Sequence, residues 1–525
     1  MKKQFRLRLQ PSQAASDAQI RETLAIAAGF PAKQLTGYSL LRKSIDARGK
    51  NVFINLTAEA SFGEPFQPQL PPQIIFKQVT PSSKKVIIIG AGPAGLFAAL
   101  KLLEAGIKPI ILERGKNVQE RRRDLAKLNR EGIVNPESNY CFGEGGAGTY
   151  SDGKLYTRSN KRGDINRILS LFVQFGAGDH ILYEAHPHIG TNKLPGIISA
   201  MRECILAHGG EVWFGQKVTD ILHHNHIFYA VKTASGDQFD GDALILACGH
   251  SARDVFRLFT SSNILIQPKP FALGVRIEHP QEIIDSIQYH CKQRDAFLPP
   301  ASYGLVQQVN NRGVFSFCMC PGGIIAPAST EPGRLVVNGW SPSKRNNPFA
   351  NSGMVAEVDL ANAISFLNNR DKQNDPLVFM DFQDEVEKRC FEAGGGKFVA
   401  PAARMEDFCS KKLSANLPEA SYIPGLKAVE LSEVLPTFIY QSLAKAFIMF
   451  GKKLKGFYSN EAIVVATESR TSSPVRIPRD KSSLQHPQVK NLFPCGEGAG
   501  YAGGIVSAAM DGELIATAAA NTLHS

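Results

Sequence analysis

The sequence predicts an α/β protein that combines a discontinuous Rossmann-type domain with an inserted α+β second domain and a small N-terminal α+β domain. An apolar, β-branched run at 86–89 is followed by a glycine loop, a helical pattern at 94–105 and a second apolar run at 109–112. This order within about thirty residues is typical of one βαβ unit. A strand, a glycine loop and a small-residue helix recur at 492–525, and 525 residues are too many for one hydrophobic core.

Changes in composition predict where the domains begin and end. Strand-like alternation at 4–9 and 51–56 and helical spacing at 18–28 predict a small N-terminal α+β domain, which we expect to serve packing or oligomerisation rather than catalysis. The segment that follows this domain is rich in proline, as is typical of a linker. We therefore expect an N-terminal domain at 1–62, a linker at 63–83, a first part of the Rossmann-type domain at 84–267, an inserted substrate or cap domain at 268–436 and a second part of the Rossmann-type domain at 437–525.

Composition narrows the class of protein. Hydrophobic residues make up 43% of the chain and charged residues 20%, as in ordinary globular proteins. The sequence shows no apolar run of the roughly 18 residues that a membrane span needs. No apolar signal region follows the basic start, so we expect a cytoplasmic protein without a membrane partner. The nine cysteines contain no C-x-x-C pair, which favours a reducing compartment. The net charge of +11 is dispersed along the chain, so charge alone does not indicate a nucleic-acid partner.

The strongest motif is a glycine fingerprint, Gly90-Ala91-Gly92-Pro93-Ala94-Gly95, directly after the first apolar strand. In this context Gly90 allows a tight turn, Gly92 lets the backbone approach a pyrophosphate, and Gly95 lets helix and strand pack closely. The helix N-terminus offers free N–H groups to the phosphates. Glu113 ends the second strand, 23 residues after Gly90, where a carboxylate accepts hydrogen bonds from a ribose and repels the extra phosphate of NADP.

Two further stretches match the same glycine pattern without its context. The stretch 143–148 neither follows an apolar strand nor opens an apolar helix. The stretch 498–503 follows a short strand and opens a helix, but no second parallel strand can complete a βαβ unit before Ser525. We therefore expect one dinucleotide site of the Rossmann type.

One fingerprint does not decide between NAD and FAD, but the arrangement of the motifs resembles that of glutathione-reductase-like and HI0933-like flavoproteins. The residues that carry this resemblance are 90–95, Glu113, 243–249 and 492–504. Longer phrases resemble a bacterial family of uncharacterised FAD-dependent dehydrogenases; they are 43–48, 142–155, 187–191, 316–323, 468–476 and 496–505. The resemblance implies non-covalently bound FAD in a discontinuous FAD-binding domain, with ADP on the βαβ unit and the flavin held by the C-terminal segment.

The fingerprint and the resemblance together imply a set of cofactor-binding residues and no metal ligand. In this class the backbone at 217–218 contacts adenine, the loop 143–154 runs along the pyrophosphate or the flavin, and the helix after 503–504 points its N-terminus at the flavin. The set is Gly90, Gly92, Pro93, Ala94, Gly95, Glu113, Arg114, Gly145, Gly146, Ser151, Asp152, Lys154, Lys217, Val218, Ala247, Gly249, Gly496, Glu497, Gly503, Gly504 and Ile505.

No catalytic residue follows from the sequence, because a flavin carries the hydride chemistry itself. Cys318 and Cys320 form a C-x-C pair that is either a redox pair or, as we prefer, two small buried residues on a strand. Asp152 and Lys154 are expected to contact ribityl hydroxyls or phosphate rather than to act as acid or base.

Two other groups of polar residues leave their roles open. Arg470 and Arg476 can clamp a substrate carboxylate, contact phosphates or hold a loop together. His186 and His188 lie in a His-Pro-His segment without a third ligand nearby, so we expect loop histidines rather than a metal site.

These observations predict an FAD-dependent oxidoreductase, a dehydrogenase, that acts on a small-molecule substrate. NADH or NADPH is left open as an electron donor that would bind without a dedicated domain. Two alternatives are a flavin-dependent RNA-modifying enzyme, suggested by the charge and the N-terminal domain, and a non-catalytic FAD-binding scaffold or sensor.

Overall fold

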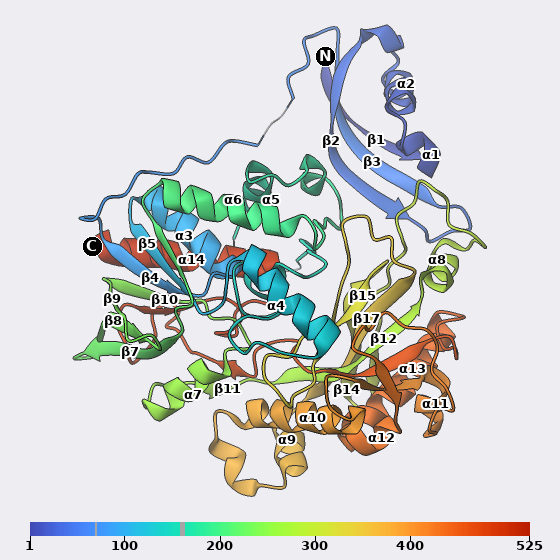
Figure 1. Ribbon diagram of the computed structural model, residues 1–525. Coiled ribbons are helices and arrows are strands. Elements are labelled where there is room, and N and C mark those ends of the chain that lie inside the picture. Colours follow the sequence, from blue (N-terminus) through green and yellow to red (C-terminus); the bar gives the residue numbers. More distant parts are fainter. Residues whose placement is uncertain (69–70, 158–162, 525) are drawn as a thin grey trace.

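The computed structural model describes residues 1–68, 71–157 and 163–524. Within them the chain forms an N-terminal domain, a Rossmann-type domain and an inserted domain (Figure 1). The N-terminal domain projects from the other two, at the upper right of the view. None of the helices in this part of the chain is both long and apolar enough to cross a membrane.

The N-terminal domain is an antiparallel three-stranded sheet in the order β1-β3-β2 with a helix packed on it. Its elements are β1 (Lys2–Leu9), α1 (Pro11–Ala14), α2 (Asp17–Ala28), β2 (Leu35–Asp46) and β3 (Phe53–Phe62). The helix α2 buries Leu24 against the sheet and ends at Gly29, whose φ of 73° is left-handed. The prediction of β1 and α2 is confirmed, whereas the long strand β2 was not predicted. A parallel bridge between Lys43 and Glu184 attaches β2 to the Rossmann-type domain.

A five-stranded parallel sheet in the order β22-β10-β4-β5-β6 forms the centre of the Rossmann-type domain. Its strands are β4 (Lys85–Ile89), β5 (Lys108–Glu113), β6 (Glu211–Phe214), β10 (Ala243–Leu246) and β22 (Leu492–Pro494). Ile88 pairs with Ile111 on one side and with Ile245 on the other, and all three are buried. Helices cover the sheet, so the predicted apolar runs correspond to strands buried on both faces.

Two helices of this domain, α3 (Pro93–Ala105) and α14 (Ile505–His524), begin directly at glycine loops. The domain also contains α4 (Val118–Glu131), α5 (Ile165–Gln174), α6 (Leu194–Ala207) and α7 (Arg253–Ser261). A small antiparallel sheet of β7 (Val218–His224), β8 (Ile227–Thr233) and β9 (Gln238–Asp240) extends the domain. Helix α14 lies against α3 so closely that a Cβ added to Gly512 would lie 2.2 Å from the carbonyl oxygen of Ala94. The C-terminal helix therefore completes the unit that begins with the fingerprint.

The inserted domain is built on a seven-stranded sheet in the order β13-β14-β17-β12-β20-β18-β19. Its strands are β12 (Phe271–Pro280), β13 (Val306–Val309), β14 (Arg312–Cys320), β17 (Phe349–Val358), β18 (Ala400–Arg404), β19 (Leu426–Ala428) and β20 (Ile463–Glu468). The pair β15 (Ile324–Pro327) and β16 (Val337–Trp340) forms a second, smaller sheet. The helices are α8 (Gln281–Tyr289), α9 (Leu360–Leu367), α10 (Val378–Gly394), α11 (Met405–Ser410), α12 (Leu431–Val434) and α13 (Thr437–Lys453).

The inserted domain ends later than the sequence predicts. The predicted boundary at 436 separates α13 and β20 from this domain, yet β20 pairs with β12 in the middle of its sheet. The chain leaves and returns to the Rossmann-type domain at two short antiparallel strands, β11 (Gln267–Pro268) and β21 (Val475–Arg476). The prediction was wrong at this end because strand pairing between residues almost 200 positions apart leaves no local signal.

Glycine at position 512 is expected to be required for the packing of α14 on α3. A Gly512→Ala substitution should lower the free energy of unfolding by about 1–3 kcal/mol, because the added methyl group overlaps the Ala94 carbonyl. Urea unfolding followed by tryptophan fluorescence measures the change.

Gly196 in α6 provides a matched control, since none of the described atoms lies within 4 Å of the position its Cβ would take. Gly196→Ala should be neutral or stabilising by up to about 1 kcal/mol. Equal stabilities for the two variants would contradict the proposed helix contact.

Candidate functional site

The fingerprint loop leaves the N-terminus of α3 open. The φ of Gly90 is 103°, and its N–H donates to the Leu112 carbonyl at 2.9 Å, which fixes the turn after β4. A Cβ on Gly95 would lie 2.0 Å from the Gly90 carbonyl oxygen, so the helix can start here only with glycine at that position. Gly92 is the N-cap of α3, and no side chain of the described chain caps the helix there. The first N–H groups of α3 are therefore available to an anion.

A second glycine loop lies directly on the fingerprint loop. The N–H of Gly145 donates to the Ala91 carbonyl at 2.8 Å, and a Cβ on Gly146 would lie 3.1 Å from the Cα of Gly92. Residues 146–148 form one turn of 3₁₀ helix, which agrees with the prediction that this stretch is not a second Rossmann unit. The two loops can approach this closely only because both lack side chains.

The buried side chain of Arg121 holds the second loop in place. This residue of α4 is 0% exposed, and its guanidinium donates to the carbonyl oxygens of Asn139 and Glu144, each at 2.8 Å. It donates further to the carbonyl oxygens of Tyr140 (2.9 Å) and Gly146 (2.8 Å). Burial lowers the pKa of Arg121. In the sequence Arg121 is part of the basic run Arg121-Arg122-Arg123. Its position on the buried face of α4 was the signal that could have indicated its role.

Glu113 joins three backbone segments at the end of β5. One carboxylate oxygen accepts from the N–H of Ala91 at 2.9 Å. The other accepts from the N–H groups of Gly115 and Gly143, each at 2.9 Å. The carboxylate is therefore fixed between both glycine loops, and its contact with a ribose stays a prediction.

A third glycine loop reaches the same region from the C-terminal segment. Gly148 lies between Pro93 and Ile505, since a Cβ there would be 3.4 Å and 3.2 Å from their side chains. At Gly503 and Gly504 such a Cβ would have no described atom within 4 Å, so space is open before α14 begins. The helices α3 and α14 thus present their N-termini beside one loop.

Glu497 is the acidic residue of this third loop. Burial raises its pKa to about 7, and Lys269 nearby acts in the opposite direction. Lys269 in turn donates to the Ser472 hydroxyl at 3.3 Å. Asp511 of α14 holds this loop, because its carboxylate accepts a hydrogen bond from the N–H of Gly496 at 2.7 Å.

The three glycine loops (90–95, 143–148 and 496–504) together form a cradle. At its other end, where we expect adenine, charged side chains are bound to one another. Arg114 donates to Glu137 (2.6 Å) and Asp254 (2.8 Å), and Lys217 pairs with Glu137 at 3.0 Å. Val218 begins β7 and is buried. The backbone at 217–218 stays the part that we expect to contact adenine.

The strand β10 ends beside the fingerprint. The N–H of Ala247 donates to the Ile89 carbonyl at 2.9 Å. Gly249 has a φ of 78°, and no atom in the described ranges lies within 4 Å of the position its Cβ would take. This glycine turn therefore keeps the edge of the cradle open.

Asp152 and Lys154 face the inserted domain. Asp152 forms a buried ion pair with Arg345 at 2.8 Å, and Lys154 donates to the Met319 carbonyl. Ser151, one position earlier, donates to the Gly148 carbonyl at 2.7 Å. The expected contacts of Asp152 and Lys154 with the cofactor stay predictions, but their side chains are engaged by the other domain.

The histidine pair is divided between two environments. His188 contacts the Ser343 carbonyl at 3.2 Å, and burial, with Arg345 nearby, lowers its pKa to about 4. His186 is exposed and lies 4.9 Å from the ring of Tyr156. His188 is therefore neutral at pH 7 and lies at the contact between domains.

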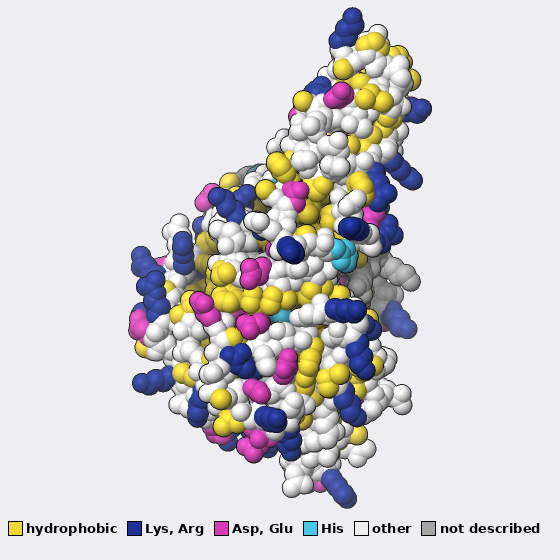
Figure 2. All heavy atoms as spheres, turned by 90° about the vertical axis from the view of Figure 1, so that its right-hand side faces the viewer, with side chains coloured by type: hydrophobic (Ala, Val, Ile, Leu, Met, Phe, Trp, Pro, Cys, Tyr) yellow, Lys and Arg dark blue, Asp and Glu magenta, His cyan; other side chains and the backbone are white. Residues whose placement is uncertain are grey.

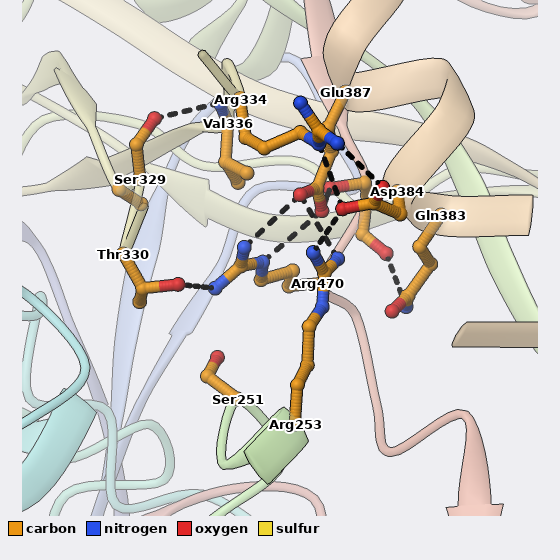
Figure 3. Close-up of polar contacts among 12 residues, drawn as sticks. Ser251, Arg253, Ser329, Thr330, Arg334, Val336, Gln383, Asp384, Glu387 and Arg470 are labelled. Carbon is orange, nitrogen blue, oxygen red and sulfur yellow. Dashed lines mark hydrogen bonds and ion pairs between the residues drawn. The ribbon is translucent and has the colours of Figure 1, made fainter. Parts of the chain in front are cut away.

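Arg470 belongs to a buried ion network that connects the domains (Figure 3). Its guanidinium donates to both carboxylate oxygens of Glu387 on α10, at 3.1 and 3.0 Å, and to Thr330 at 2.8 Å. Arg253 of α7 donates to the same carboxylate at 2.9 Å and to Asp384 at 3.0 Å. Of the roles that the sequence left open, the structure favours the structural one for Arg470. Arg476 is exposed and lies over the Tyr501 ring at 5.4 Å.

Cys318 and Cys320 end β14, and their sulfur atoms are 4.0 Å apart. Cys320 is buried as expected, whereas Cys318 is only half-buried. The expected regular alternation is wrong here, because the register shifts between Phe317 and Cys320.

A cavity of about 690 Å³ opens beside the crossing between the domains. Phe271, Phe315 and Phe317 form its apolar wall, and Thr471 and Ser472 contribute hydroxyl groups. Ser472 is the partner of Lys269, which acts on Glu497 of the third glycine loop. The cavity is therefore connected with the glycine loops through a short polar chain.

The residues of the cradle fit a dinucleotide. The uncapped N-terminus of α3, the open glycines before α14 and a fixed carboxylate supply the donors, the space and the acceptor that a pyrophosphate and a ribose need. The fold and the site define a flavoprotein whose cofactor is FAD, because residues 83–133 match the family described as "FAD binding domain" and 270–471 match "FAD-dependent protein, C-terminal domain-like". Residues 1–61 match a domain of unknown function.

A protein of Clostridium beijerinckii, described as uncharacterised, is 42% identical over 434 residues, which cover 82% of this chain and 79% of the clostridial protein. The chain belongs to the same family as this protein. The match at 270–471 also agrees with the late end of the inserted domain.

Solved flavoprotein structures are more distant. CtdE in complex with FAD is 11% identical and has a TM-score of 0.31, with 83% of this chain and 84% of that chain covered. A geranylgeranyl bacteriochlorophyll reductase-like protein of Thermoplasma acidophilum is 12% identical with a TM-score of 0.35, with 84% and 80% covered. At these scores the similarities carry no argument about function.

Glu387 is expected to stabilise the protein in a pH-dependent way. The two arginines lower its pKa from about 4.5 to about 2, although burial alone acts in the opposite direction. Because the pKa of Glu387 is lower in the folded protein than in the unfolded chain, the ionised carboxylate stabilises the folded protein at pH values above about 4.5. This stabilisation is lost as the pH falls toward 2. Glu387→Gln should lower the free energy of unfolding by about 3–5 kcal/mol at pH 7. Urea unfolding between pH 7 and pH 3 should show the difference from the wild type becoming smaller.

Glu385, on the same helix, is the control because its ion pair with Arg389 is partly exposed. Glu385→Gln should change the stability by less than about 0.5 kcal/mol. A loss in Glu387→Gln that is constant with pH would contradict the assignment of the charge.

Proposed function

We propose that the protein is an FAD-dependent oxidoreductase of the dehydrogenase type that acts on a small molecule. The observation that carries this proposal is the meeting of three glycine loops at the N-termini of α3 and α14. Such an arrangement can hold the two ends of one extended cofactor. FAD, when bound, supplies two-electron hydride chemistry, and the protein supplies orientation and electrostatics.

The residues of the cradle have separable roles in this proposal. The N-terminus of α3 and Gly92 would hold the pyrophosphate, and Glu113 would accept hydrogen bonds from the ribose. The N-terminus of α14 after Gly504 would stabilise negative charge on the reduced flavin. Glu497, whose pKa burial raises to about 7, can hold or release a proton near neutral pH.

The cavity beside Ser472 is the candidate substrate site. Its phenylalanine wall and its hydroxyl groups suit a small molecule with one apolar and one polar side. We propose NADH or NADPH as a transient donor, since the sequence contains one fingerprint of the Rossmann type. The nine cysteines, none of them in a C-x-x-C pair, suit a cytoplasmic location.

The face of the molecule that Figure 2 shows does not favour the RNA-modifying alternative. Figure 2 shows Lys and Arg side chains on one face interspersed with Asp and Glu, without a continuous basic area on that face. Recognition of RNA would need such an area.

An absorbance spectrum of the purified protein tests the proposal. We expect flavin bands that bleach when NADH, NADPH or dithionite is added without oxygen. Flavin that stays oxidised with all three reagents would contradict an oxidoreductase and favour a scaffold.

Gly92→Ala is expected to weaken FAD binding by about tenfold or more, a change of about 1.4 kcal/mol. The added methyl group would separate the pyrophosphate from the backbone. Within the described protein, the atom nearest to this methyl group would be the Cα of Gly146, at 3.9 Å. The apoprotein should therefore keep its stability. Fluorescence titration with FAD measures the affinity, and Gly49→Ala, in an open turn of the N-terminal domain, is the control. Unchanged affinity in Gly92→Ala would show that the pyrophosphate binds elsewhere.

A further inference from the structure

We propose that Cys318 and Cys320 form a redox-active dithiol that reduces low-molecular-weight disulfides and closes to an intramolecular disulfide. The sulfur atoms are 4.0 Å apart, about 2 Å more than the length of a disulfide bond. This activity lies in the inserted domain and goes beyond the flavin chemistry proposed above.

The backbone of β14 is shaped to place the two sulfur atoms together. Phe317 pairs with Gly353 and Cys320 with Asn351, so three steps on β14 oppose two steps on β17. This is a β-bulge, and it re-aims the side chains of the bulged strand. Cys318 has a φ of 47°, a left-handed conformation that is unfavourable for a residue with a side chain. Such strain occurs most often at functional sites.

Positive charge surrounds the pair. Arg276 donates to the Cys318 carbonyl at 2.7 Å and to the sulfur of Cys320 at 3.5 Å. Lys154, from the Rossmann-type domain, donates to the carbonyl of Met319 between the two cysteines. Glu468 neutralises part of the charge on Arg276 through an ion pair of 2.6 Å. Among the charged groups that act on Cys318, Lys154 and Arg276 lower the pKa of its thiol, whereas Asp152 raises it.

A hydrogen bond joins the two thiols. The hydrogen bond from Cys320, followed by Lys154 and Arg276, lowers the pKa of Cys318 well below its ordinary value, against the effect of burial. The same hydrogen bond and burial raise the pKa of Cys320. Cys318 is half-buried and Cys320 is fully buried. A reachable thiolate beside a protonated, buried thiol is the arrangement of an attacking and a resolving cysteine.

The reaction proceeds by two exchanges. The thiolate of Cys318 attacks a disulfide RS–SR, one sulfur–sulfur bond forms as the other breaks, and RS⁻ leaves and takes a proton from water. Cys320 then loses its proton to water and attacks the sulfur of Cys318, so that the second RS⁻ leaves and also takes a proton from water. The dithiol is oxidised by two electrons, and the small disulfide is reduced to two thiols. Oxidation also removes the negative charge that faces Lys154.

Alkylation of the holoprotein tests the thiolate. Iodoacetamide at pH 6 should modify Cys318 at least about tenfold faster than Cys204, whose pKa burial raises. Peptide mass spectrometry measures both rates in the same wild-type sample, so the comparison needs no variant. Equal rates would overturn the proposal.

Oxidation with hydroxyethyl disulfide tests the exchange. The wild type should lose two hydrogen masses in the peptide that contains both cysteines and release two thiols per chain. Cys320→Ser should instead keep one hydroxyethyl group on Cys318, and Cys318→Ser should form neither product. Cys409→Ser, a substitution elsewhere in the same domain, should behave as the wild type. Absence of the internal disulfide in the wild type at all ratios of hydroxyethyl disulfide to its thiol would overturn the proposal. Neither test measures bleaching of the flavin, so both are independent of the proposed flavin chemistry.

Discussion

The contact between the two large domains depends on one buried carboxylate. Glu387 receives Arg253 from the Rossmann-type domain and Arg470 from the segment that returns to it, and its side chain is fully buried. Removal of either partner would leave an uncompensated charge in a medium of low polarity. This is far more unfavourable than the loss of an ion pair that is exposed to solvent. The network therefore gives the inserted domain one defined position relative to the glycine loops. The contacts of Asp152 with Arg345 and of Lys154 with Met319 are possible only in that position.

A second constraint acts inside the Rossmann-type domain, where backbones approach each other without side chains. Gly92 and Gly146 face each other, and Gly512 faces Ala94. These contacts bring two helix N-termini to one loop, and the fixed donors Ala91, Gly115 and Gly143 on Glu113 keep the loops from moving apart. A cofactor that binds here meets a site whose donors are already oriented, so little ordering is needed on binding.

The site is assembled from segments that are distant in the sequence, and this limits what the sequence can predict. The fingerprint at 90–95 and the small-residue helix that begins at 505 were predicted because each depends on local spacing. Arg121 was missed as a functional residue, since its role depends on carbonyl groups of a loop that only the fold places around it. The contact of Lys154 with the segment of Cys318 was equally hidden, because it joins two domains. The sequence offered a redox pair only as the less preferred of two interpretations.

The sequence by itself determined the βαβ unit, the glycine loops and the small-residue helix α14, because backbone geometry and burial period are written into neighbouring residues. Only the tertiary structure decided where the inserted domain ends, since β20 joins its sheet by pairing with β12 across the whole domain. It also decided that Arg470 binds Glu387 and that Cys318 lies beside Lys154. The physical reason is that ion pairs and strand pairing act through space, whereas a sequence pattern records what a residue requires of its neighbours along the chain.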